Sequence, residues 1–156
     1  MQIVNIFLYL SRVMKKMIFS MLLMLSVLSA WSQEAQDSLP FKVTLVNKEY
    51  QVCIYMNLYD KNIRVPGQDI YGDLPGYFAA DRDSRLWLIV DGELTGENSA
   101  RLEFVNDFGS EDLVCDLKYE GKGRYTLHRV SGSTLKIVVN KKWLKIPKTL
   151  EMKVRE

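Results

Sequence analysis

The chain has 156 residues, of which 47% are hydrophobic and 26% charged, and its formal net charge is +2 with a single histidine counted as neutral. With a net charge this small, from both acidic and basic residues, the chain lacks the excess of positive charge that attracts nucleic acid or an anionic membrane. A single histidine argues against histidine-rich metal sites and histidine-dependent hydrolysis, and no motif in the chain predicts a catalytic, metal or cofactor site.

The N-terminal part of the chain has the pattern of a secretory signal peptide. Lys15 and Lys16 precede an uncharged, mostly apolar run at residues 17–30, and polar residues begin at Ser32. A charged segment, then a hydrophobic segment, then small residues is the order found in signal peptides. The run is shorter than the roughly 18 to 20 apolar residues that a membrane-spanning helix needs.

Cleavage after Ser32 is predicted, because Ala30 and Ser32 offer signal peptidase the small side chains it requires. Residues 14–32 are therefore interpreted as the signal peptide, and residues 1–13 as an upstream extension from a misassigned start site. Cleavage removes three positive charges and no acidic residue, so the formal charge falls from +2 to −1. We predict an exported protein, periplasmic or secreted, with no transmembrane segment in its mature form.

Residues 33–40 are expected to be a flexible leader, and residues 41–156 a single all-β domain. Short runs rich in Val, Ile, Leu, Tyr and Phe alternate with turn residues, and no window has a helical period. The predicted strands are residues 41–46, 49–59, 86–90, 99–105, 113–119, 124–130, 134–139 and 150–154. The stretch between the second and third of these strands is predicted to be a long loop with at most one short strand.

Most of the predicted strands are joined by short connections, and strands joined in this way are usually antiparallel neighbours. The domain is therefore predicted to be an up-and-down meander of about eight strands. Such a meander forms either a β-barrel or a two-sheet sandwich, and the short connections favour the barrel. Most strands are apolar on one face only. Residues 86–90 are apolar throughout, which predicts a strand that is covered on both faces.

The meander and the export signal together are similar in outline to the lipocalin-like ligand carriers. The Gly-x-Trp motif that is usual near the first strand of that family is missing from residues 41–46. The likeness is one of architecture, and architecture alone carries neither a ligand nor an activity.

The two cysteines are predicted to lie on opposite faces of the sheet. Cys53 is out of phase with the apolar residues of its strand, whereas Cys115 is in phase with them. A disulfide needs Cα atoms within about 7 Å, so the alternation favours two free thiols. A disulfide between them is the alternative, since an oxidising compartment allows one.

Aromatic residues beside amides are the strongest candidates for ligand contact. Two tyrosines share the outer face of residues 49–59 with Gln51 and Asn57, and three more aromatics lie in the predicted long loop. The candidate ligand-binding residues are Tyr55, Tyr59, Tyr71, Tyr77 and Phe78. Exposed rings of this kind suit a sugar or a protein partner. In the alternative interpretation, the loop folds over the strand and the rings bury one another.

Other polar residues have simpler interpretations. His128 is out of phase with the apolar residues of its strand and is predicted to be an ordinary surface residue. Asp81 and Asp83 could offer oxygens to Ca²⁺ but lack the rest of an EF-hand loop, so a solvated turn is favoured. A lysine-rich stretch around Trp143 could touch an anionic glycan, or is simply a solvated loop. Its lysines are Lys141, Lys142 and Lys145.

The functional hypothesis is an exported, non-enzymatic β-domain that binds a glycan, a lipid or a protein outside the cytoplasm, without a cofactor. The first alternative is a structural or interaction component of the bacterial envelope that acts through free strand edges. The second alternative is a hydrolase that uses two carboxylates, whose spacing a sequence cannot reveal.

Overall fold

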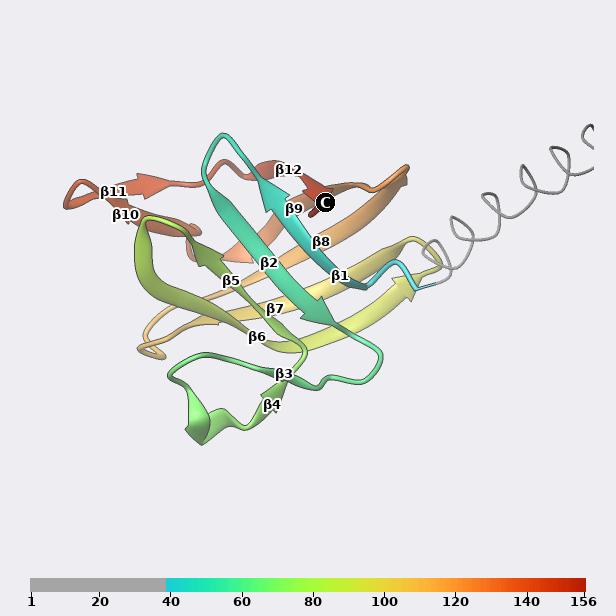
Figure 1. The fold of residues 1–156 in the computed structure, drawn as a ribbon, viewed down its shortest axis with the longest axis horizontal. Helices are drawn as coiled ribbons and strands as arrows, with labels where there is room; N and C mark the ends of the chain where they lie inside the picture. Colours follow the sequence, from blue (N-terminus) through green and yellow to red (C-terminus); the bar gives the residue numbers. More distant parts are fainter. Residues whose placement is uncertain (1–38) are drawn as a thin grey trace, which may run out of the picture. The chain divides into compact units, whose positions relative to one another are not determined.

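The computed structural model describes residues 39–156, which form an all-β fold (Figure 1). Within these residues eight strands close into an antiparallel barrel. They are β1 (Lys42–Asn47), β2 (Val52–Asn57), β5 (Gly76–Ala80), β6 (Asp83–Gly96), β7 (Ser99–Asn106), β8 (Asp112–Gly121), β9 (Arg124–Gly132) and β12 (Thr149–Val154). The predicted fold class is confirmed. The predicted upstream extension, the signal peptide and most of the leader lie outside the described residues.

The barrel follows the chain around its circumference. Each barrel strand pairs with the next one along the chain, and β1 closes on β12 through the Cα partners Leu45–Val154 and Val46–Lys153. Two hairpins interrupt the meander without changing its order. The first is formed by β3 (Ile63–Arg64) and β4 (Asp73–Leu74) with the short 3₁₀ helix η1 (Asp69–Tyr71) between them, and the second by β10 (Lys136–Val139) and β11 (Lys142–Lys145).

The strands differ from the sequence-based prediction in two regions of the chain. The predicted long loop contains the barrel strand β5, whose glycine and alanines weaken the apolar alternation that marks a strand. The predicted strand at residues 134–139 forms β10, but β10 pairs with β11 and takes no place in the barrel ring. Asn140 and Lys141 both have positive φ, as a tight type I′ hairpin turn requires, and this turn folds β11 back onto β10.

The interior of the barrel is filled by apolar side chains. Inward-facing residues of all eight strands form one continuous core, and the hairpin β10–β11 adds Ile137 to it. The aromatic rings in this core include Phe41, Phe78, Phe104 and Trp87, all nearly or completely inaccessible to solvent. The Trp87 indole Nε1–H donates to the Lys136 carbonyl at 3.2 Å, which fixes the hairpin to the barrel.

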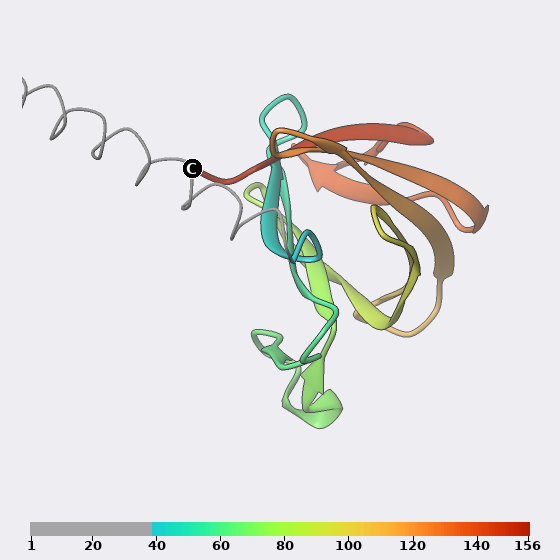
Figure 2. The same ribbon diagram turned by 90° about the vertical axis from the view of Figure 1, so that its right-hand side faces the viewer.

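Residues 86–90 of β6 are covered on both faces, as their uniformly apolar sequence predicts. Its inward residues join the main core, while Leu88 points outward and forms a second small cluster with Val65 and Leu74. These two partners belong to the excursion that contains β3 and β4. In Figures 1 and 2 the tip of this excursion, with η1, extends away from the barrel wall. Among residues 39–156, no helix is long and apolar enough to cross a membrane.

Close approach of two backbones explains the glycine that begins β5. A Cβ added to Gly76 would lie 2.1 Å from the Tyr55 carbonyl oxygen and 2.9 Å from the Met56 Cα. No side chain fits in that space without a shift of the barrel wall. The same position reduces the hydrophobic signal of β5, so one residue accounts both for the close packing and for the missed strand.

Candidate functional site

The five predicted aromatic residues separate into four places in the structure. Tyr55 and Tyr77 lie on neighbouring strands of the barrel wall and stack on its outer face, with ring centroids 4.8 Å apart and an interplanar angle of 24°. Arg155 donates to the Tyr55 hydroxyl at 2.8 Å. Tyr71 is exposed at the end of η1, and Tyr59 is exposed just beyond β2.

Phe78 is a correction to the predicted contact surface. It is completely buried in the barrel interior, because residues 76–80 form a strand and not a loop. Alternation along this strand points Tyr77 outward and Phe78 inward. Of the five predicted contact residues, the structure therefore joins Tyr55 and Tyr77 in one stack, leaves Tyr59 and Tyr71 exposed elsewhere, and removes Phe78 from the surface. Desolvation, followed by the neighbouring Tyr55, raises the pKa of Tyr77.

Both cysteines are free and buried, and they occupy opposite faces of the barrel wall as the alternation predicts. Cys115 belongs to the interior core, whereas Cys53 lies beneath the outer surface opposite Val46 and Ala79. Desolvation raises the pKa of Cys53, and it raises that of Cys115 to about 12. A reactive thiol needs the opposite shift, so neither cysteine is placed to act as a nucleophile.

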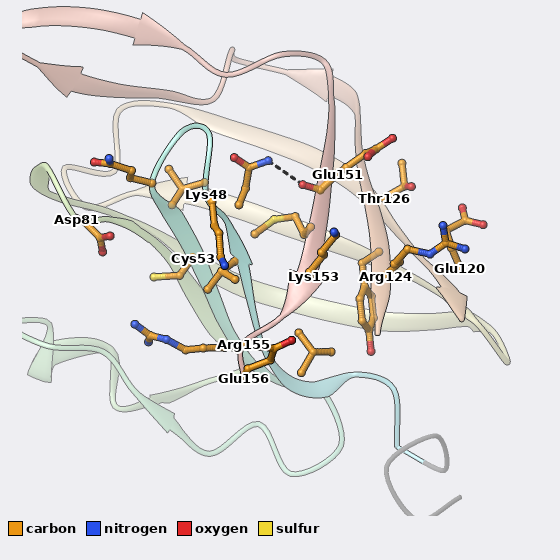
Figure 3. A pocket seen from close by; sticks show the side chains of 17 residues that line it. Lys48, Cys53, Asp81, Glu120, Arg124, Thr126, Glu151, Lys153, Arg155 and Glu156 are labelled. Carbon is orange, nitrogen blue, oxygen red and sulfur yellow. Dashed lines mark hydrogen bonds between the residues drawn. The ribbon is translucent and has the colours of Figure 1, made fainter. Parts of the chain in front are cut away.

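A large depression follows the line where the barrel closes, and we call it the seam pocket (Figure 3). It is lined by residues of β1 and β12 and their neighbours, and its open volume is about 1170 Å³. Its charged residues are Lys48, Asp81, Glu120, Arg124, Glu151, Lys153, Arg155 and Glu156. In Figure 3, Lys153 lies between the side that carries Cys53 and the side that carries Arg124. Equal numbers of acidic and basic side chains suit a polar ligand of no strong net charge.

A smaller pocket of about 170 Å³ lies at one end of the barrel, and we call it the rim pocket. It is formed by the start of β6, the turn between β7 and β8, and the β10–β11 hairpin. Two of its lining residues are strongly exposed rings: Phe108 is 76% exposed and Trp143 is 55% exposed. The Arg85 guanidinium carbon lies 4.6 Å from the Trp143 ring centroid, and the Lys136 ammonium nitrogen 4.7 Å from it.

The polar residues of the rim pocket are held in place by short hydrogen bonds. Asn106 is buried, and its side-chain oxygen accepts from the backbone N–H of Ser110 at 2.8 Å. Lys136 donates to Glu111 at 2.8 Å. Asp107 accepts from the backbone N–H of Leu86 through one carboxylate oxygen at 3.2 Å. The other oxygen of Asp107 is buried and has no hydrogen-bond partner among the described residues.

The remaining candidates have structural roles or lie on the surface. The Nδ1 atom of His128 is 2.8 Å from the Thr149 hydroxyl, with the ring half-exposed. The Asp83 carboxylate accepts from the backbone N–H of Val138 at 2.6 Å and also pairs with Arg85. Among residues 39–156, no group of three or more His, Cys, Asp or Glu side chains is placed to hold a metal ion.

Two carboxylates outside the pockets have pKa values below their ordinary range. The pKa of Asp60 is lowered by hydrogen bonds from Asn57 and Lys42, and that of Asp91 by the ammonium of Lys61. Both belong to exposed ion pairs on the barrel wall.

The rim pocket combines residues that the sequence indicated with residues that it did not. The lysine-rich stretch led to Trp143, but the cations against its ring are Arg85 and Lys136, from a distant strand and from the opposite strand of the hairpin. No pattern in the sequence singled out Phe108, which lies in the turn between β7 and β8. The tryptophan within this lysine-rich stretch was the only sequence signal that pointed to the rim pocket.

Comparison with known proteins adds no information on the seam pocket or the rim pocket. No protein-family model, no curated protein and no solved structure matches the chain.

Proposed function

We propose that this chain is an exported, non-enzymatic binding domain that holds a glycan or a protein ligand on the outside of its barrel. The filled interior is the observation that carries the proposal. An eight-stranded barrel encloses room for side chains or for one small ligand, and here the space is taken by rings such as Phe78, Phe104 and Trp87. A lipid inside the barrel would have to displace them, whereas the seam pocket and the rim pocket are open to solvent.

The two alternative functions have less support. Interaction through the edges of the first and last strands requires those edges to be free, but β1 and β12 pair with each other. The outer edge of β11 carries exposed Lys142 and Lys145, and edge lysines oppose the addition of a further strand. A carboxylate hydrolase needs a general acid with a raised pKa. The described carboxylates with a resolved pKa shift, Asp60 and Asp91, are shifted downward.

Export to the periplasm or the medium belongs to the same proposal and rests on the N-terminal pattern of the sequence. N-terminal sequencing of the protein from the cell exterior or periplasm tests it. We expect Gln33 as the first residue. An intact N-terminus on protein recovered from the cytoplasm would contradict export.

A fluorescent fatty acid tests whether the ligand site is outside the barrel. Titrated into the purified protein, the probe should show no saturable binding, because an interior ligand would have to displace the packed core side chains. An Ile70→Ala variant controls for adhesion to the surface, since Ile70 is an apolar side chain that is 97% exposed. Saturable binding that persists in Ile70→Ala would indicate an interior site and contradict the proposal.

A further inference from the structure

We propose that the rim pocket is a subsite for a single ring of a neutral sugar. This inference rests on the proposed function, because it names the ligand class and the place for a domain that binds on its outer surface. Three independent features of the pocket support it: its exposed rings, its internally balanced charges and its small volume.

Exposing large aromatic rings to water is energetically unfavourable, which points to a binding role for the exposed rings of the rim pocket. Trp143 lies on the face of the β10–β11 hairpin opposite the one that packs against the core, since Ile137 faces the core and Val138 is the strand partner of Trp143. Phe108 is exposed in the nearby turn. Two large rings that line the same solvent-open pocket place apolar surface where a ligand can cover it, and exposed apolar patches often mark binding sites. The apolar face of a pyranose ring packs well on such aromatic surfaces.

The tryptophan is held in place before any ligand arrives. Arg85 and Lys136 both approach its ring within 4.7 Å, and such cation–π contacts favour one ring position. Arg85 is itself paired with Asp83, whose carboxylate binds the hairpin backbone at Val138. A side chain that is already ordered loses less entropy on binding.

The charges of the pocket favour a neutral ligand over an anionic one. Each cation that lines it already has an acidic partner: Asp83 pairs with Arg85 at 3.3 Å and Glu111 with Lys136 at 2.8 Å. An anionic ligand would have to compete with both carboxylates. A sugar hydroxyl, in contrast, can donate to a carboxylate or accept from an ammonium without disturbing the net charge.

One acceptor in the pocket lacks a donor. The second carboxylate oxygen of Asp107 is buried without a hydrogen-bond partner among the described residues, and a buried oxygen left unpaired destabilises the protein. Asp107 is one of the residues that line the pocket, and the hydroxyl of a sugar ring bound there would supply a donor for this carboxylate. The volume of about 170 Å³ accommodates one ring and is too small for an extended ligand to be enclosed.

A panel of neutral oligosaccharides built from glucose, galactose, mannose and xylose tests the inference. Each is titrated into the purified protein, with binding followed by calorimetry and by the indole N–H resonance of Trp143, which the spectrum of Trp143→Phe identifies. We expect at least one of them to bind and to shift that resonance. Trp143→Ala and Phe108→Ala should each weaken binding by about tenfold or more.

The matched control is Tyr71→Ala, which removes an exposed ring far from the pocket and should leave affinity unchanged. Phe108→Ala guards against a folding artefact, because a residue 76% exposed in a turn contributes little to the core. Sugar binding that is indifferent to both Trp143→Ala and Phe108→Ala would overturn the subsite and leave the proposed function standing. Binding by no sugar of the panel would also overturn it. A fatty acid inside the barrel would instead refute the proposed function.

Discussion

Replacing Asp83 by alanine should loosen the β10–β11 hairpin from the barrel. The side chain of Asp83 is only 6% exposed. Its carboxylate accepts from the backbone N–H of Val138 at 2.6 Å, from that of Arg85 at 3.2 Å and from the Arg85 guanidinium at 3.3 Å. Hydrogen bonds to charged groups contribute about 1.5–3 kcal/mol each. Because the two bonds to Arg85 are local and partly exposed, we expect a total loss of about 2–4 kcal/mol.

Urea unfolding measures this loss directly. With a slope of about 2 kcal/mol/M, in the middle of the range for a small protein, the expected loss moves the midpoint down by roughly 1–2 M. Asp83→Asn keeps one oxygen acceptor and should fall between the wild type and Asp83→Ala. Asp81→Ala is the matched control, because Asp81 lies two residues earlier with an exposed side chain, and its effect should stay within about 0.5 kcal/mol. If Asp83→Ala and Asp81→Ala had the same midpoint, this account of the hairpin anchor would be wrong.

Three further predictions concern the barrel wall, the thiols and acid. Gly76→Ala should destabilise the protein by about 3 kcal/mol or more in urea unfolding, because the added Cβ would meet the Tyr55 carbonyl oxygen at 2.1 Å. A loss under about 0.5 kcal/mol would mean that β2 and β5 can move apart at little energetic cost. Cys53 and Cys115 should resist iodoacetamide at pH 8 in the native protein, and both should react in denaturant, as measured by intact mass. A mass two hydrogens lower, with no reaction even in denaturant, would reveal a disulfide. Hydrogen bonds lower the pKa of Asp60 in the folded state, so its contribution to stability is present above the ordinary carboxyl pKa of about 4 and is lost as the pH falls through the lowered value. Asp60→Asn should flatten this acid dependence, and an unchanged pH profile would contradict the assignment.

The strands with clear alternation were predictable from the sequence, and those without it were not. In β7, Ala100, Leu102 and Phe104 face the core between charged residues, so the period of two is plain. In β5 the small residues at Gly76 and Ala79 hide the same period. Strand β10 has the alternation of a barrel strand, but its pairing is decided by the turn that follows it. Hydrophobic pattern therefore identified where strands form, while turn geometry decided which partners they take.

The candidate site was much less predictable than the fold. Sequence alternation placed Tyr55 on the outer face, and the structure places its ring there. It could not place Phe78 correctly, because a residue assigned to a loop has no face to be assigned to. The rim pocket joins residues as distant in the chain as Arg85 and Trp143. Their meeting depends on the register between the hairpin and the barrel, which no local pattern encodes.

A crystal structure of the purified protein under xenon pressure tests the central claim, that the barrel is closed and filled so that its ligand binds outside. Xenon enters empty apolar cavities in protein interiors. The account predicts Leu45 paired with Val154 across the seam and no xenon among the rings of Phe41, Phe78 and Phe104. Xenon at full occupancy among those rings, or a seam open between β1 and β12, would contradict it and restore an interior ligand as the leading hypothesis.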